Sequence, residues 1–210
     1  NNSTLNVGGN FLIESDAAGS GSFIDNGTLT VTGTSSAECY VTGGQWHGIS
    51  APVSGETFAA MYLGGAPEVF VQSFDESSNL YTDISDITTP IGDMVGWFTF
   101  IEGTTQTFTF EGSFRTGTVG AADNMAYSLE GWNLVGNPFP SAIDWDAGSG
   151  WTKTNVNNAT YVYDNGTWST YVAGVGTNNG SRYIAMSQGF FVQATATGTL
   201  SMDVDVCVHN

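Results

Sequence analysis

The chain has 210 residues and a formal net charge of −17, because 20 Asp and Glu residues face only 3 Lys and Arg residues. Binding to nucleic acid or to an anionic lipid surface depends on Lys and Arg, so this balance excludes both as main partners. Hydrophobic residues make up 40% of the chain and charged residues only 11%, which favours a folded core over a charge-dominated disordered tail.

Short runs of Val, Ile, Thr and aromatic residues, separated by Gly, Asn, Asp and Ser, predict β-strands along the whole chain. A helical turn or two is expected only near residues 57–62. Polar residues or Gly interrupt every apolar stretch before it reaches the roughly 18 residues of a membrane-spanning helix, so no membrane insertion is expected. The clearest predicted strands are 28–32, 68–74, 96–101, 105–111, 159–163, 189–194 and 199–206.

Residues 1–44 contain short strands rich in Gly, Ser, Thr and Asn, with almost no aromatic residues. Short, evenly spaced strands of this kind suit a β-solenoid-like stack, which would be the end of a longer array. The alternative is that these strands simply belong to the sheets of the unit that follows. Either way, the segment is expected to form an N-terminal strand layer.

The rest of the chain contains an internal repeat, in which four sequence anchors recur in the same order. The differences in spacing between the anchors are those that loop insertions would produce. We therefore predict an all-β fold with two related antiparallel β-sandwich or jelly-roll-like units, at 45–120 and 127–210, beside the N-terminal layer. The matching anchors are 46–52 with 132–138, 70–75 with 161–164, 96–100 with 189–193, and 108–111 with 200–203.

Residues 131–145, with the sequence GWNLVGNPFPSAIDW, resemble a segment that recurs in large secreted and surface proteins of Bacteroidota. Those proteins are exported by the type 9 secretion system, and the segment lies upstream of their C-terminal sorting domain. The strings at 21–24, 45–52, 159–164 and 187–192 are similar to other parts of the same family. The resemblance implies an extracellular or cell-surface location and a non-catalytic β architecture, and it brings no catalytic residues with it.

The residues themselves give little support to catalysis. A GxSxG nucleophile motif is absent, and His47 and His209 are the only histidines. A carboxylate pair for glycoside hydrolysis would need a suitable separation in space, which a sequence does not give. Solvated strand-edge or turn positions are the preferred interpretation of the acidic residues, so we do not expect an enzyme.

Calcium is the metal that this composition favours, because it takes six to eight oxygen ligands from carboxylates, amides and carbonyls. Asp144 and Asp146 form the candidate metal site, with Asp144 as a simple turn cap being the alternative. No other cofactor is expected. Cys39 and Cys207 are predicted to form a disulfide, and two separate buried thiols are the other interpretation.

The aromatic residues divide into two groups. Those on the repeated strand anchors are assigned to the core: Trp46, Trp97, Phe98, Trp132, Phe190 and Phe191. The polar loops of the second unit carry the others, namely Trp145, Trp151, Trp168, Tyr171 and Tyr183. An exposed ring beside amide side chains presents an apolar face to a sugar and hydrogen-bonds its hydroxyls. The candidate glycan-binding residues are therefore Trp151, Trp168, Tyr171, Tyr183 and Asn165, the alternative being that these rings pack beneath their own loops.

The leading functional hypothesis is a non-catalytic extracellular module that binds carbohydrate or mediates surface adhesion, with a glycan as partner. One alternative is a structural subunit of a surface layer or filament that self-associates through β-strand pairing. A second alternative is an accessory domain of a secreted polysaccharide-degrading enzyme.

Overall fold

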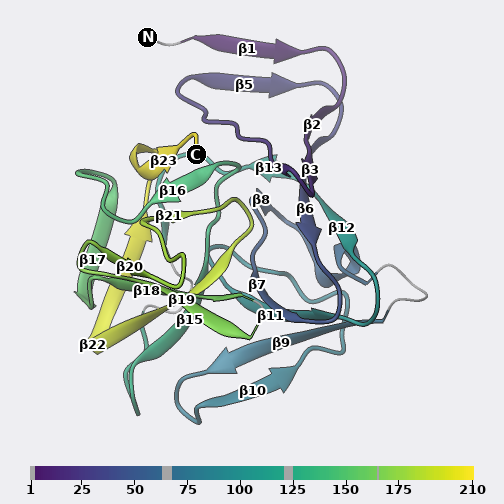
Figure 1. Cartoon of the computed structure of the whole chain (residues 1–210). Helices are drawn as coiled ribbons and strands as arrows, with labels where there is room; N and C mark the ends of the chain where they lie inside the picture. The colour runs from purple at the N-terminus through teal and green to yellow at the C-terminus, as the bar shows by residue number, and fades with distance from the viewer. Residues whose placement is uncertain (1–2, 63–67, 121–124, 165) are drawn as a thin grey trace.

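The computed structural model describes residues 3–62, 68–120, 125–164 and 166–210, and it shows an all-β protein built from several sheets (Figure 1). The predicted fold class is thus confirmed. Within these residues helix occurs only as two 3-10 turns, η1 (Phe58–Ala60) and η2 (Val204–Val206). The first lies where a helical turn was expected.

The strands are short, with one exception of 14 residues at the end of the second unit. They are β1 (Thr4–Val7), β2 (Phe11–Ile13), β3 (Ser15–Asp16), β4 (Gly19–Ser20), β5 (Thr28–Val31), β6 (Ser35–Val41), β7 (Trp46–Ile49), β8 (Val53–Ser54), β9 (Val69–Asp75), β10 (Leu80–Asp83), β11 (Trp97–Ile101), β12 (Gln106–Glu111), β13 (Ser113–Phe114), β14 (Val119–Gly120), β15 (Trp132–Gly136), β16 (Ala142–Asp144), β17 (Trp151–Val156), β18 (Ala159–Asp164), β19 (Thr167–Val172), β20 (Val175–Thr177), β21 (Tyr183–Ile184), β22 (Gly189–Met202) and β23 (Cys207–Val208).

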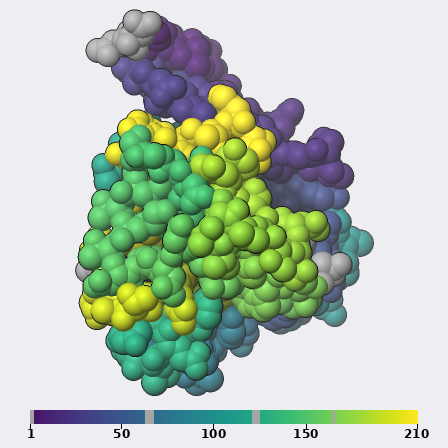
Figure 2. Space-filling model, turned by 60° about the vertical axis from the view of Figure 1, so that its left-hand side comes forward, coloured from purple at the N-terminus to yellow at the C-terminus, as the bar shows by residue number. Residues whose placement is uncertain are grey.

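The N-terminal strands form an arm that projects from the body of the molecule. β1 pairs with β5, and β2 pairs with β6, both in parallel. Figure 1 shows β1 and β5 standing apart from the other sheets, and Figure 2 shows the same purple segment outside the rounded body. The far side of β6 pairs with β12 antiparallel, so the arm is joined directly to the first unit.

The first unit surrounds a core that includes residues from the arm. One sheet has the order β10-β9-β11-β7, and the other has the order β12-β6-β2. Alternation along β12 directs Phe108 and Phe110 inward, where both are fully buried, while Thr109 between them is exposed. These rings belong to a first core cluster with Ile13, Ala37 and Val41 of the N-terminal layer.

β22 organises the second unit, because β14, β15, β17 and β18 all pair with it. The two strands predicted at 189–194 and 199–206 are therefore wrong as separate elements. β17 pairs with β22 at Ala194 and again at residues 199–202, with a register irregularity between them, and Gly198 forms a bridge with Met125. The chain then turns into η2 at Val204. Together these strands enclose a second core cluster that includes Trp145, Phe139 and Phe190.

The repeated anchors occupy matching places in the two sheets. In the first unit Phe98 pairs with Gly48 on one side and with Gln72 on the other. In the second unit Phe191 pairs with Leu134 on one side and with Tyr161 on the other. In the alignment of the anchors, Gly48 corresponds to Leu134 and Gln72 corresponds to Tyr161. Equivalent residues therefore pair with one another in the two sheets.

The two units also interlock. One isolated β-bridge joins Ile49 to Gln188, and another joins Val135 to Val95. Ile49 and Val135 occupy equivalent positions in the two units, and so do Val95 and Gln188, so the two bridges are related by the repeat. The backbones meet closely where Gly48 faces Gly189, since a Cβ at Gly48 would overlap the Gly189 carbonyl oxygen. Met94 packs in the second core cluster, whereas Met186 packs in the first, so the units exchange side chains across their junction.

Candidate ligand-binding groove

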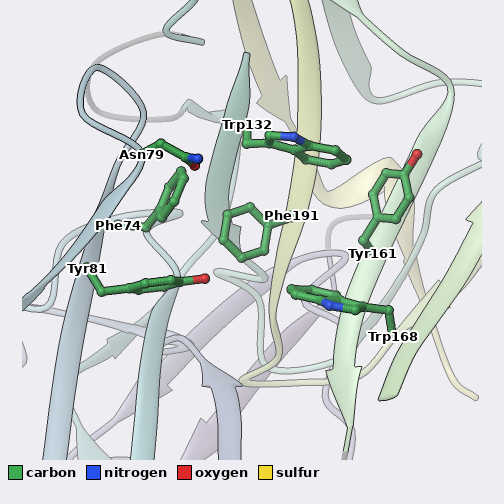
Figure 3. A pocket seen from close by; sticks show the side chains of 7 residues that line it. All are labelled: Phe74, Asn79, Tyr81, Trp132, Tyr161, Trp168 and Phe191. Atoms are coloured by element: carbon green, nitrogen blue, oxygen red, sulfur yellow. The ribbon is translucent and has the colours of Figure 1, made fainter. Parts of the chain in front are cut away.

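An open groove of about 340 Å³ lies where the aromatic faces of the two units meet. This volume is within the roughly 300–1,000 Å³ of small-molecule sites. Figure 3 shows the rings arranged around its opening. The lining residues are Phe74, Asn79, Tyr81, Trp132, Tyr161, Trp168 and Phe191.

Hairpin register places the groove residues. Phe74 and Tyr81 are cross-strand partners on β9 and β10, and their ring centroids lie 5.2 Å apart. The matching pair in the second unit is Tyr163 and Trp168, on β18 and β19, at 5.1 Å. Facing residues on one side of an antiparallel pair are close enough for rings to touch. Each hairpin therefore presents one aromatic pair toward the junction.

Phe191 of β22 forms the floor of the groove and is only 5% exposed. The ring of Trp132 lies at 85° to it, with centroids 6.4 Å apart, and that of Trp168 lies at 70°, at 5.6 Å. In Figure 3 the two indoles lie on opposite sides of the Phe191 ring. The arrangement is a slot with two aromatic walls and an aromatic floor.

Polar groups line this slot without adding charge. Asn79 sits in the β9–β10 turn with a φ of 56°, a left-handed conformation that Asn tolerates. Its amide and the Tyr81 hydroxyl point toward the centre in Figure 3. Burial raises the pKa of Tyr81, with a smaller contribution from repulsion between its phenolate and that of Tyr163, so the Tyr81 hydroxyl is protonated near neutral pH. None of the lining residues is acidic or basic.

A buried carboxylate joins two of the segments that line the groove. Glu76, in the β9–β10 turn, is 6% exposed and accepts backbone N–H bonds from Ser128, Leu129 and Gly131 at 2.7, 2.7 and 2.9 Å. Gly131 directly precedes Trp132. The Glu76 carboxylate therefore ties the turn that carries Asn79 to the segment that leads into Trp132.

Of the predicted glycan-binding residues, only Trp168 lines the groove, where its side chain is 40% exposed. Trp151 lies elsewhere: its indole donates to the Asp144 carbonyl at 2.8 Å and its ring packs on the fully buried Trp145. Tyr171 is 8% exposed, and its hydroxyl donates to Asp146.

Tyr183 is exposed and lies with Tyr171 in a separate hollow of about 350 Å³ on the other side of the β18–β19 hairpin. Asn165 lies outside the described residues. The structure thus does not gather the four described candidates into one site.

The candidate calcium ligands are engaged by protein groups. Arg182 donates two hydrogen bonds to the Asp144 carboxylate, at 2.6 and 2.7 Å. The Tyr171 hydroxyl donates a hydrogen bond to the Asp146 carboxylate. Asp144 also accepts the Asp146 backbone N–H at 3.0 Å, as expected of a turn cap. Within the described ranges, no group of three or more His, Cys, Asp and Glu side chains is placed to hold a metal ion.

The predicted disulfide is absent, and both cysteines are free thiols. Cys39 packs against the first core cluster and Cys207 against the second, so the two lie in different hydrophobic environments. Burial raises the pKa of Cys39 to about 12 and that of Cys207 to about 11. The alternative interpretation, two separate thiols in apolar surroundings, describes the structure.

The motif at 131–145 has a structural task. Asn137 is fully buried, and its amide nitrogen donates to the carbonyls of Ser141 and Ala185 at 2.8 and 2.9 Å. Its amide oxygen accepts the Phe139 N–H at 3.0 Å. The Asn-Pro-Phe-Pro-Ser string is thus a turn fastened by one buried side chain, and it contributes no reactive group.

The aromatic residues on the strand anchors divide between core and groove. Phe98 and Phe190 are buried, as predicted, but Trp132 and Phe191 also line the groove. Sequence reasoning missed Phe74, Asn79, Tyr81 and Tyr161. The repeat held a usable signal, since Phe74 and Tyr81 occupy the places that correspond to Tyr163 and Trp168.

No helix in the described part of the chain combines the length and the apolar character that crossing a bilayer requires. No protein-family model, curated protein or solved structure matches the chain.

Proposed function

We propose that the chain is a non-catalytic, extracellular carbohydrate-binding module, and that the slot between Trp132 and Trp168 holds a neutral sugar ring. The observation that carries the proposal is the pair of indole walls over the Phe191 floor. A pyranose with equatorial substituents has axial C–H groups on both faces, so aromatic walls on two sides complement its apolar surfaces.

Charge supports a neutral ligand. The three basic residues of the chain are Arg115, Lys153 and Arg182, and none of them lines the groove. A phosphorylated or sulfated ligand would therefore meet a molecule of charge −17 without a cation to receive it. The Asn79 amide and the Tyr81 hydroxyl supply the donors and acceptors that sugar hydroxyls need.

The test is retention on neutral polysaccharides, measured by affinity gel electrophoresis with soluble β-glucan, xylan and mannan. Trp168→Ala removes one wall, and we expect it to weaken retention on the bound polysaccharide by about tenfold or more. Tyr81→Phe removes only the hydroxyl and should weaken it less. Tyr127→Ala is the matched control, because Tyr127 is 47% exposed and does not line the groove.

Because Trp168 also touches Phe98 and Tyr163, the melting temperature of each variant is measured in parallel. Equal retention of Trp168→Ala and the wild-type chain, with both folded, would overturn the proposed site. Absence of retention on all three polysaccharides would overturn the ligand class. Surface adhesion, or an accessory role beside a polysaccharide-degrading enzyme, would use this same groove.

A further inference from the structure

The arm consists of two stacked rungs. The outer rung comprises residues 3–13, with β1 and β2, and the inner rung comprises residues 27–37, with β5 and the start of β6. Parallel pairing runs from Thr4 on Thr28 to Ile13 on Ala37, with a constant offset of 24 residues. A constant offset across two strands and the corner between them is the geometry of a β-solenoid.

The rungs also repeat in sequence. Both contain the pattern T-L-x-V-x-G, at 4–9 and at 28–33, so that Thr, Leu, Val and Gly each lie over an identical residue. At the corner the Gly33 N–H donates to the Gly9 carbonyl at 3.1 Å, and the Thr34 N–H donates to the Asn10 side chain at 3.1 Å. The outer rung thus has the features of an internal rung, and no strand of the described residues caps it.

The outer rung has an edge with which no strand in the described part of the chain pairs. Ser3 and Val7 direct their carbonyls to the inner rung, where they accept the N–H groups of Thr28 and Thr32 at 2.9 and 3.0 Å. Because peptide groups alternate along a parallel strand, those of Thr4 and Asn6 face away from it. Residues 3–13 include no charged residue and no Pro, the usual protection of an exposed strand edge.

The apolar side chains show the same lack of cover. Leu5 is 46% exposed and Leu12 is 42% exposed. Leu29, which lies beneath Leu5 in the inner rung, instead packs against the first core cluster. A further layer on the outer rung would shield Leu5 and Leu12 from water.

We propose that the edge of the outer rung is an interaction surface for a further solenoid rung, a strand, Gly-containing corner and strand with the T-L-x-V-x-G pattern. This rung lies parallel and in register, so it continues the ladder that already joins β5 to β1. The stack grows only outward, because β12 covers the far side of β6. A second copy of the chain fits less well, since two molecules of charge −17 repel each other and antiparallel pairing would break the like-on-like register.

The experiment adds a copy of residues 3–26 directly ahead of Ser3, which gives the chain a third rung with the native connection. Hydrogen exchange of the amides of Thr4, Asn6 and Leu12 is then measured by NMR. We expect exchange at these amides to slow by about tenfold or more, because they gain strand partners. The matched control carries Leu5→Pro and Phe11→Pro in the added copy only, because the N–H groups at these positions face the next rung inward, and it should exchange as fast as the unextended chain.

Equal exchange in the extended chain and its proline control would overturn the proposal. Protection of the unextended chain that rises with protein concentration would also overturn it, because a second copy would then be the occupant. Neither result depends on the groove, so this test and that of carbohydrate binding fail independently.

Discussion

Glu76 stabilises the groove through the hydrogen bonds that it accepts from backbone N–H groups, and substitution of this residue tests that role directly. Glu76→Ala should lower the free energy of unfolding by about 1–3 kcal/mol, because the N–H groups of Ser128, Leu129 and Gly131 lose their acceptor, and that of Gly131 is buried. Glu76→Gln keeps one acceptor oxygen and should cost less. Urea denaturation measures both, and Glu130→Ala, on an exposed neighbour, is the control. Equal stability of Glu76→Ala and this control would contradict the assignment.

The same carboxylate gives the protein a dependence on acid. Burial alone would raise the pKa of Glu76, but the N–H donors of Gly131, Leu129 and Ser128 outweigh it and hold the pKa below its ordinary value of 4.5. A depressed pKa stabilises the fold above the unfolded-state value and loses that contribution as pH falls through the folded-state value. From about pH 5 down to about pH 3, the wild-type chain should therefore lose more stability than Glu76→Gln. Parallel loss in both chains would refute this origin.

The thiols provide a second residue-level prediction. With a pKa of about 12, Cys39 is thiolate in only about one molecule in ten thousand at about pH 8. Iodoacetamide should therefore leave Cys39 unmodified in the folded protein and alkylate both cysteines in guanidinium, as read by mass spectrometry. A non-reduced mass lower by two hydrogens would instead reveal a disulfide.

The contacts of single side chains were the hardest feature of this protein to predict from the sequence. Trp168 and Trp151 look alike in sequence, since both follow polar loop residues at the start of a strand. Trp168 faces the other unit, whereas Trp151 stacks on Trp145 within its own. Which of these happens depends on contacts between residues far apart in the chain, and local pattern does not encode those contacts.

At the scale of elements, the junction of β7 with β22 depends on glycine. Gly48→Ala should lower the free energy of unfolding by about 1–3 kcal/mol, since its methyl group would overlap the Gly189 carbonyl. Gly148→Ala is the matched control, because a Cβ there meets no heavy atom within 4 Å. Urea midpoints of the two variants should differ clearly, and coincident midpoints would argue against the close approach.

Strands were predicted well where alternation is strong. Phe108 and Phe110 alternate with exposed Thr109 and Glu111, and β12 lies where the pattern placed it. The prediction was wrong at 195–199, where small and polar residues indicated a loop between two strands. Pairing with β17 at Ala194 and at residues 199–202, together with the bridge of Gly198 to Met125, joins both ends of that stretch into one strand, so tertiary context overrides local propensity.

At the scale of the whole molecule, the repulsion among its negative charges is the property that salt changes. Each basic side chain is held locally: Arg115 by Asp93, Arg182 by Asp144, and Lys153 by the Trp145 carbonyl. The other carboxylates repel one another, so raising NaCl from about 10 to about 200 mM should raise the melting temperature by a few degrees. CaCl2 at matched ionic strength should have the same effect, because Asp144 and Asp146 are already engaged. An additional calcium-specific rise, reversed by EDTA, would show a bound cation.

The fold class was predictable from composition and turn residues, whereas the joining of the two units was not. The repeat indicates two similar sheets but says nothing of how their faces meet. Met94 of the first unit is buried in the core of the second, and Met186 of the second unit is buried in the core of the first. These contacts, and the groove between the aromatic hairpins, form only when both units are assembled.

The central place of β22 also sets the order in which the chain can fold. β15 and β17 have β22 as their only partner strand within the described sheets. Until residues 189–202 have emerged from the ribosome or from a translocation pore, β17 is therefore unpaired and β15 has only its bridge to Val95. The first unit has most of its partners earlier, although Met186 completes its core. A chain synthesised or exported from its N-terminus would thus hold the second unit open until late, with Trp132 and Trp151 exposed to chaperones during that interval.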